Sequence, residues 1–183
     1  KATLFVLPEM NIADITVNTV FDKQYKNATL AITTTLSNES ASSVATSLRY
    51  TLKDADGKTV LQKTITSKEC DSSANCQLPT VNLSVKQPKQ WNPEQPYLYQ
   101  LQTELLQAGK VLQTTSQKIG FRQIEIKGNQ FFVNGKPIKL HGVNRHSIYP
   151  LTGRSISAEL ERKDAELFRA ANCNYIRTSH YPP

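Results

Sequence analysis

The fold is decided by two stretches near the C-terminal end, Ile138-Lys-Leu-His-Gly-Val-Asn-Arg-His146 and Cys173-Asn-Tyr-Ile-Arg-Thr-Ser-His180. Each begins with an apolar run, residues 138–143 or 173–176, that predicts a buried strand, and each continues into polar side chains able to bind a ligand. A single helical pattern lies between them. Strand, helix and strand in this order predict a βαβ unit of a barrel or doubly wound sheet, in which ligands bind at the carboxyl ends of the strands.

The helix between these strands has a clear beginning. Ser157 is a suitable N-cap, and Glu159 and Glu161 lie in the first turn, where the helix dipole favours negative charge. A long loop, residues 147–156, connects the first strand to this helix, and in a barrel such a loop lies at the rim of the site. One face carries the apolar side chains that we expect to pack on the sheet: Leu160, Leu167, Phe168 and Ala171.

The preceding part of the chain alternates apolar and polar residues, which predicts strands. A tight turn is expected at Asp54-Ala-Asp-Gly57, and two short hairpins at Gly128-Asn129 and Asn134-Gly135. Residues 4–7 are expected to be a strand fragment closed by Pro8. The longer strands are expected at residues 14–20, 28–36, 44–52, 59–65, 80–85, 97–106 and 111–119. Short strands at this spacing without helices predict an immunoglobulin-like β-sandwich, so the chain is mainly β.

Charge and hydropathy restrict the partners of the chain. The net charge of +7 is spread thinly, without a basic run, so we expect no nucleic-acid partner. No apolar stretch approaches the ~20 residues that a membrane-spanning helix needs, so we expect no membrane span.

A proline-rich segment, residues 88–96, interrupts the strand pattern and cannot be a central strand. Its Trp91, with Tyr97 and Tyr99, could stack on a sugar or a base. We favour the structural interpretation, in which these aromatic side chains close the end of the sandwich.

The three cysteines leave the compartment open. Cys70 and Cys76 flank a short polar loop; a disulfide between them would indicate an exported protein, and two unpaired thiols are the alternative. Cys173 is expected to be a small buried hydrophobic residue at the start of its strand. No further Cys or His pair has the spacing of zinc ligands, so we expect no metal site.

Four motifs follow one another in the second half of the chain: Trp91 to Tyr99 with Gly120-Phe-Arg122, Phe132-Val-Asn-Gly-Lys-Pro-Ile138, Gly142-Val-Asn-Arg-His146 and Ile176-Arg-Thr-Ser-His-Tyr-Pro182. Together they resemble glycoside hydrolase family 2, and within that family the chain looks most like a β-galactosidase. The resemblance implies three parts. Residues 1–10 would be the last strand or linker of a missing N-terminal jelly-roll domain that binds sugar, residues 11–119 the immunoglobulin-like sandwich, and residues 120–183 the first βαβ portion of a catalytic (β/α)8 TIM barrel.

Members of this family hydrolyse β-glycosides with retention, by means of one glutamate as acid/base and a second as nucleophile. This sequence contains neither, because its only Asn-Glu step, Asn38-Glu39, falls in a turn of the sandwich and its helical glutamates follow no barrel strand. We therefore expect an inactive fragment of a retaining exo-glycosidase that acts on terminal β-galactosides. It has no catalytic residue of its own.

The same resemblance assigns roles to five residues. His146 and His180 would hydrogen-bond hydroxyl groups of the terminal sugar of a β-linked oligosaccharide or glycoside. Arg177 would orient the missing nucleophile and keep it ionised. Asn144 and Arg145 would support these side chains.

Two neighbouring positions carry no assigned role. Family members often have an acidic residue after the Gly-Val-Asn-Arg-His run, whereas this sequence has Ser147. His141, inside the first barrel strand, is interpreted as an ordinary structural residue.

Two other functions stay open. A β-glucuronidase of the same family also resembles the Arg-Thr-Ser-His-Tyr-Pro run, and a non-catalytic immunoglobulin-like carbohydrate- or protein-binding module would treat residues 120–183 as a tail. No cofactor is expected within this stretch, and a divalent metal of the parent protein would be held by residues that the stretch lacks. Because the two barrel strands have no further neighbours, we expect the isolated fragment to self-associate as a homo-oligomer or to leave this region poorly ordered.

Overall fold

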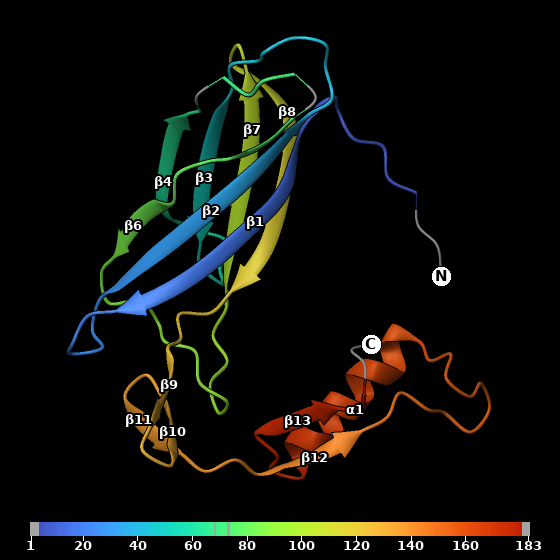
Figure 1. Cartoon of the computed structure of the whole chain (residues 1–183). Coiled ribbons are helices and arrows are strands. Elements are labelled where there is room, and N and C mark those ends of the chain that lie inside the picture. Colours follow the sequence, from blue (N-terminus) through green and yellow to red (C-terminus); the bar gives the residue numbers. More distant parts are fainter. Residues whose placement is uncertain (1–3, 68, 73, 181–183) are drawn as a thin grey trace. The chain divides into compact units, whose positions relative to one another are not determined.

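The computed structural model describes residues 4–67, 69–72 and 74–180 of the 183-residue chain. The chain divides into two compact units: unit 1 contains Lys1–Glu125 and Val133–Gly135, and unit 2 contains Ile126–Phe132 and Lys136–Pro183. The elements (Figure 1) are β1 (Met10–Phe21), β2 (Ala28–Asn38), β3 (Ser47–Lys53), β4 (Thr59–Thr66), β5 (Ala74–Gln77), β6 (Val81–Val85), β7 (Tyr99–Gln107), β8 (Lys110–Ile119), β9 (Ile124–Lys127), β10 (Gln130–Val133), β11 (Lys136–Ile138), β12 (Gly142–Arg145), α1 (Ala158–Ala170) and β13 (Tyr175–Thr178).

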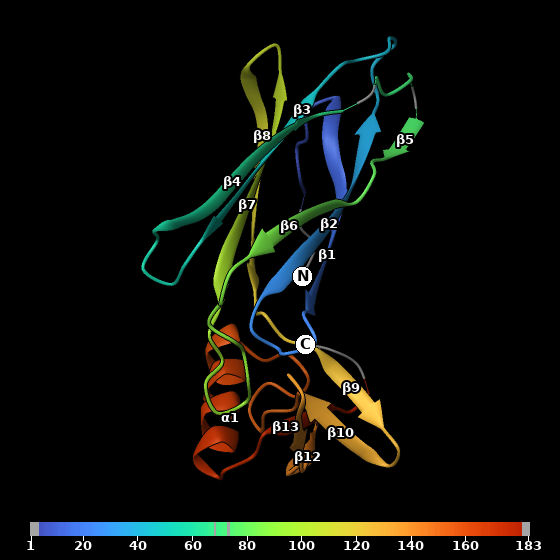
Figure 2. The ribbon, with the colours of Figure 1, turned by 90° about the vertical axis from the view of Figure 1, so that its left-hand side faces the viewer.

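Unit 1 is a β-sandwich, as the alternating pattern predicts. One sheet has the order β4-β3-β7-β8, and the other has the order β1-β2-β5 with β6 also paired to β2; Figure 2 shows the two layers. Strand β2 alternates between buried and half-buried residues along its whole length, because every second side chain of a strand faces the opposite sheet. The core between the sheets contains these completely buried side chains: Leu30, Ile32, Leu36, Leu48, Tyr50, Leu52, Leu101 and Leu105.

Tyr97 and Tyr99, which follow the proline-rich segment, pack in an aromatic cluster, which confirms the structural interpretation for these two side chains. The rings of Tyr97 and Tyr99 lie 5.0 Å apart, and the ring of Tyr99 lies 5.0 Å from that of Phe121. Trp91 packs so closely on Gly120 that a Cβ atom there would lie 2.9 Å from the Trp91 side chain. A side chain at position 120 would therefore displace the indole.

Cys70 and Cys76 form a disulfide, with their Cα atoms 5.8 Å apart. No strand was predicted at the short polar loop between them, yet β5 begins in this loop at Ala74 and continues to Gln77. This strand pairs antiparallel with the end of β2, and Leu36 lies opposite Cys76. Its pairing is set by a strand far away in sequence, so the local pattern of four residues, two of them polar, could not predict it.

The strand expected at residues 4–7 is not formed. Among the described residues no strand pairs with this segment, and a strand requires a hydrogen-bonded neighbour. Its apolar side chains are exposed, Leu4 by 93% and Val6 by 92%.

The turn between β10 and β11 belongs to unit 1, although most of both strands belongs to unit 2. Asn134 and Gly135 have φ angles of 51° and 74°, as expected for the type I′ turn. The buried Asn134 donates from Nδ2 to the carbonyl oxygen of Trp91 at 3.0 Å, and its Oδ1 accepts from the backbone N–H of Gln123 at 2.8 Å. Its own backbone N–H donates to the Gln123 carbonyl at 2.9 Å. The turn is thus bonded to the rest of unit 1 by three hydrogen bonds, two to Gln123 and one to Trp91.

Unit 2 contains the predicted strand, helix and strand, with β12 and β13 paired in parallel. The predicted bounds were wrong: residues 138–143 and 173–176 were expected, and both strands begin and end further along the chain. Parallel pairing decides these bounds. Gly142 lies opposite Tyr175, and a Cβ atom at Gly142 would lie only 2.2 Å from the Tyr175 carbonyl oxygen. Nor are the apolar residues buried, since Val143 is 40% and Ile176 37% exposed. Cys173, expected at the start of the strand, precedes it and is half-buried.

Helix α1 begins as predicted, because the Ser157 side chain accepts a hydrogen bond from the backbone N–H of Leu160. The expected inward face was only partly right. Leu160 and Phe168 are half-buried, but Leu167 is 54% exposed, and Ala171 is an exposed residue at the C-cap. Between Leu160 and Phe168, the half-buried helix positions are occupied by Glu161 and Asp164, which both form ion pairs with the buried Arg145.

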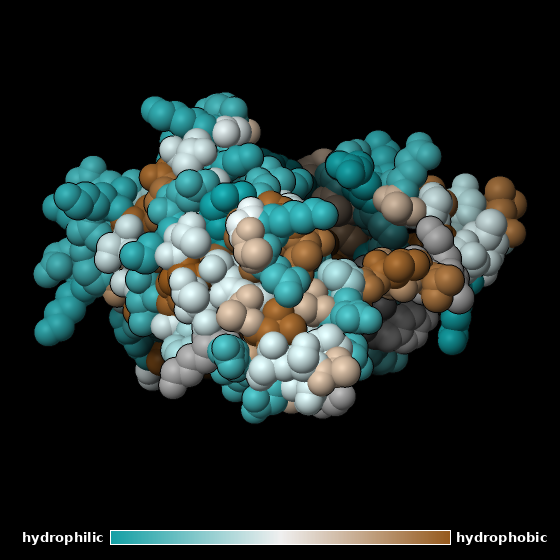
Figure 3. Space-filling view, turned by 90° about the horizontal axis from the view of Figure 1, so that it is seen from above, coloured by the Kyte–Doolittle hydropathy of each residue, from teal (hydrophilic) through white to brown (hydrophobic). Residues whose placement is uncertain are grey.

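Hydrophilic residues cover most of the molecular face shown in Figure 3, with hydrophobic residues in small groups. Within the described residues, no helix is long and apolar enough to cross a membrane.

Candidate functional site

The ends of β12 and β13 lie side by side in unit 2. Asn144 lies opposite Arg177, and Arg145 lies opposite Thr178. Residues that follow the two strands therefore leave the sheet at the same edge, as the sequence predicted.

His146 and His180 come together at this edge. His146 directly follows β12, and His180 lies two residues beyond the end of β13. The centroids of their imidazole rings are 5.3 Å apart, and the ring planes are inclined by 80°. Both side chains are exposed, and within the described part of the chain neither ring makes a hydrogen bond. Two imidazoles at this distance can contact neighbouring hydroxyl groups of one small polar ligand.

Arg177 is held next to Asn144 across the two strands. Its Nη1 atom donates to the Asn144 Oδ1 at 3.4 Å, and both side chains are exposed. No carboxylate within the described residues forms an ion pair with Arg177. Its guanidinium group is thus available to a carboxylate, which it would stabilise in the ionised form.

Arg145 is the buried charge of this unit, with a side chain that is 8% exposed. Its Nη1 lies 2.6 Å from the Glu161 carboxylate, and both Nε and Nη2 face Oδ2 of Asp164, at 2.8 and 2.7 Å. Burial opposes the charge of the guanidinium, but the hydrogen bonds and charges of the two carboxylates outweigh it and raise the pKa of Arg145. The ion pairs connect β12 to α1.

Ser147 completes this cluster. It is buried, its hydroxyl oxygen accepts from Arg145 Nη1 at 2.9 Å, and it donates to Glu161 at 3.2 Å. An acidic residue at this position would add a third carboxylate around one guanidinium, which explains how a serine fits here. The sequence did not reveal the partners of Arg145, although Glu161 and Asp164, three residues apart on one helix face, were a usable signal.

His141, interpreted above as an ordinary structural residue, lies outside this arrangement. His141 is exposed, and only its backbone makes hydrogen bonds, to Asn174 and Tyr175. Across residues 4–67, 69–72 and 74–180, no three His, Cys, Asp or Glu side chains are grouped so that they could hold a metal ion.

The family of the chain follows from sequence comparison. The chain belongs to the glycosyl hydrolases family 2: the model of that family matches residues 10–122, and the model of the family's TIM barrel domain matches residues 124–183. The expected fold class, a sandwich followed by the start of a barrel domain, is confirmed.

Individual relatives are similar over nearly the whole chain. A β-galactosidase of Alteromonas mediterranea is 31% identical over 186 residues, which cover 98% of this chain and 17% of the relative. A solved family 2 glycosyl hydrolase of Bacteroides cellulosilyticus superposes with a TM-score of 0.89 at 28% identity, over 97% of this chain and 24% of that one. A β-glucuronidase of Bacteroides uniformis superposes with a TM-score of 0.85 at 26% identity, over 96% of this chain and 22% of that one. The chain thus spans about a fifth of the length of these relatives.

Proposed function

We propose that this chain is part of a retaining exo-glycosidase that hydrolyses terminal β-galactosides, and that it supplies contacts to the sugar. The observation that carries the proposal is the adjacency of His146 and His180, whose rings lie 5.3 Å apart beyond two parallel strands. Similarity to β-galactosidases over 98% of the chain supports the substrate class.

In this proposal the two imidazoles donate to or accept from hydroxyl groups of the terminal sugar. These contacts accelerate the reaction to the extent that they tighten as the ring approaches its oxocarbenium-like transition state. Arg177, which has no carboxylate partner among the described residues, would hold the nucleophilic carboxylate ionised. Asn144 accepts from Arg177 and limits its orientations.

The two carboxyl groups that break the bond would come from other parts of the protein. A retaining mechanism needs them about 5 Å apart on opposite sides of the glycosidic bond. Glu161 and Asp164 do not meet this need, because both are paired with Arg145. We likewise infer that any divalent metal of the whole protein is held outside the described residues.

A β-glucuronidase activity is the second candidate, since the superposition with the Bacteroides uniformis β-glucuronidase favours it. The two substrates differ in charge, because a glucuronide carboxylate needs additional cationic donors. The non-catalytic module is disfavoured: it treats residues 120–183 as a tail, whereas residues 124–183 match the family's barrel domain.

The test is to measure kcat and KM of the full-length protein that carries this segment, with nitrophenyl β-galactoside and nitrophenyl β-glucuronide. His146→Ala and His180→Ala should each lower kcat/KM by roughly 10- to 100-fold, as expected for the loss of one or two hydrogen bonds of about 1.5 kcal/mol. His141→Ala is the matched control and should stay within about twofold.

Two results would contradict the proposal. Full activity of both His146→Ala and His180→Ala on both glycosides would remove the sugar-contacting role. Hydrolysis of the glucuronide alone would replace the galactoside assignment by the second candidate.

A further inference from the structure

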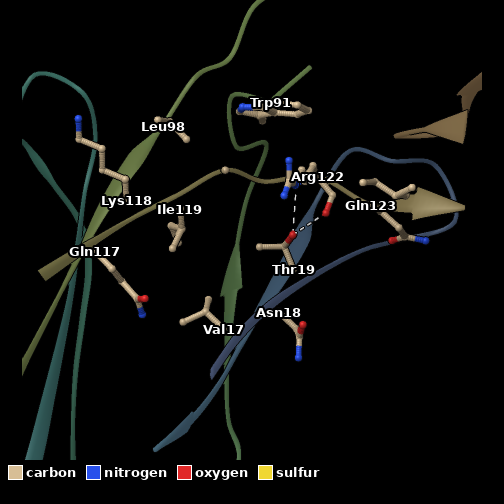
Figure 4. Close-up of a pocket in the computed structure, with 12 residues that line it drawn as sticks. Val17, Asn18, Thr19, Trp91, Leu98, Gln117, Lys118, Ile119, Arg122 and Gln123 are labelled. Atoms are coloured by element: carbon tan, nitrogen blue, oxygen red, sulfur yellow. Dashed lines mark hydrogen bonds between the residues drawn. The ribbon is translucent and has the colours of Figure 1, made fainter. Parts of the chain in front are cut away.

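Unit 1 contains a cavity of about 590 Å³ at one end of the sandwich (Figure 4). Its walls come from β1, from the end of β8 and the residues that follow it, and from the segment between β6 and β7. The lining residues used below are Thr19, Trp91, Gln117, Lys118, Ile119 and Arg122. The volume lies in the range typical of small-molecule sites.

The lining is positively charged. Arg122 and Lys118 are its two cations, but Lys118 extends away from Arg122 in Figure 4, and no Asp or Glu among the described residues lines the cavity. Within the described part of the chain, neither cation forms an ion pair, and the Arg122 guanidinium makes no hydrogen bond. A ligand beside Arg122 therefore meets an unpaired positive charge without competition from a carboxylate, which favours an anion.

Arg122 is fixed in place although its charge is unpaired. The Thr19 hydroxyl donates to the Arg122 carbonyl at 2.7 Å and accepts from its backbone N–H at 3.2 Å, as the dashed lines in Figure 4 mark. The guanidinium lies over the Trp91 ring, 4.7 Å from its centroid. This contact restricts the guanidinium and leaves its N–H groups without hydrogen-bond partners among the described residues, so they can donate to a carboxylate or sulfate with less entropy lost on binding.

The other lining groups suit a sugar ring. Val17 and Leu98 offer apolar surface to ring C–H groups, whereas Ile119 is only 8% exposed. The Gln117 side chain extends from β8 toward β1 in Figure 4. Its Nε2 atom is buried and has no hydrogen-bond partner among the described residues, a state that costs about 1–3 kcal/mol. A rotation of this amide toward a ligand hydroxyl would satisfy it.

We propose that this cavity binds an acidic sugar residue, one that carries a carboxylate or a sulfate ester, with Arg122 contacting the acidic group. The proposal does not depend on the activity proposed above. Every lining residue belongs to unit 1, and His146 and His180 belong to unit 2.

Trp91 makes the test specific, because it is the single tryptophan of the chain and lines the cavity. The 183-residue chain is titrated at about 150 mM salt, which screens general attraction to its net charge, while Trp emission and heat of binding are recorded. The probes are methyl β-glucuronide, galactose 6-sulfate, neutral methyl β-glucoside and sodium sulfate. At least one acidic sugar should show saturable binding that is at least tenfold tighter than that of the neutral sugar or of sulfate. Saturation by methyl β-glucuronide would identify the acidic group as a carboxylate, and saturation by galactose 6-sulfate would identify it as a sulfate ester.

Two variants that each remove one positive charge distinguish binding in the cavity from general attraction of the ligand to the positively charged protein. Arg122→Gln should weaken binding of the acidic sugar at least tenfold, whereas Arg154→Gln, at an exposed loop position in unit 2, should stay within twofold. The Arg122 side chain is exposed and its backbone bonds to Thr19 do not depend on it, so the variant should fold; the amide NMR spectrum checks this.

Four results would overturn the proposal. They are the absence of saturable emission or heat changes with both acidic sugars, equal binding of the neutral sugar, equal binding of sodium sulfate, and equal weakening by the two substitutions.

Discussion

Replacing Arg145 by methionine is expected to release helix α1 from strand β12. Methionine keeps much of the buried side-chain volume and removes the charge. The Glu161 and Asp164 carboxylates, now 2.6 and 2.7 Å from the guanidinium, would then lie close to each other without a cation, and the Ser147 hydroxyl would lose its donor.

The magnitude follows from the burial of the partners. Removing one member of a buried ion pair costs about 3–5 kcal/mol, because the other member stays buried and unpaired. Here Arg145 is 8% exposed, but the side chains of Glu161 and Asp164 are 23% and 41% exposed. Water therefore screens both carboxylates, and we expect Arg145→Met to cost less than a fully buried pair would, about 2–3 kcal/mol of helix stability. This corresponds to a roughly 30- to 150-fold larger opening constant of α1.

Amide hydrogen exchange measures this opening directly, since protection reports local unfolding. Protection of residues 158–170 should fall by this factor, while protection of β2, β3 and β7 in unit 1 stays unchanged. Arg162→Met is the matched control, because Arg162 lies on the same helix, is exposed and forms no ion pair among the described residues.

The reasoning would be refuted if Arg145→Met and Arg162→Met changed the exchange of α1 equally, within about threefold. The ion pairs would then contribute no more to the packing of α1 than an ordinary exposed arginine does.

Three further predictions concern both units. The hydrogen bonds and charge of Arg49 hold the pKa of Glu104 below its usual value. This pair therefore stabilises unit 1 above about pH 4.5, and the stabilisation is lost as the pH falls through the lowered pKa of Glu104. The difference in melting temperature between the parent chain and Glu104→Gln should shrink from pH 6 to pH 3. Gly142→Ala places a Cβ atom 2.2 Å from the Tyr175 carbonyl oxygen and should abolish exchange protection of β12 and β13, and unchanged protection would contradict the close approach. Leu101→Ala, at a completely buried site, should lower the stability of unit 1 by about 2–5 kcal/mol in a urea titration, and a loss below 1 kcal/mol would show that the site collapses around the cavity.

The sandwich could be predicted because its strands carry their pattern locally. Alternation along β2 and the turn at Asp54 to Gly57 are properties of neighbouring residues, and both appear in the structure. The start of α1 was equally local, since the Ser157 cap needs only the next three residues. By contrast, β5 and the bounds of β12 depend on strands that pair from far along the chain, and no local pattern specifies such a register.

The candidate site shows the same division. The positions of His146 and His180 after two strands were predictable from the order of strand, helix and strand. The cluster around Arg145 was not, because ion pairing between a strand and a helix depends on how the two pack. The resemblance assigned a supporting role to Arg145, and this buried side chain is bound to Glu161, Asp164 and Ser147. Whether Arg145 also supports the two histidines stays a prediction.

The hydrogen bonds of Asn134 have a consequence for how the sandwich can be inherited. The chain leaves unit 1 after Glu125 and returns to it for residues 133–135, so the physical boundary of the sandwich is not a single point in the sequence. Recombination that joined a foreign barrel domain directly after Glu125 would leave the Trp91 carbonyl and the Gln123 backbone N–H without their partner. Exchange of this domain between relatives should therefore succeed only when the crossover lies beyond Gly135, and the hairpin that follows the sandwich should be inherited together with it.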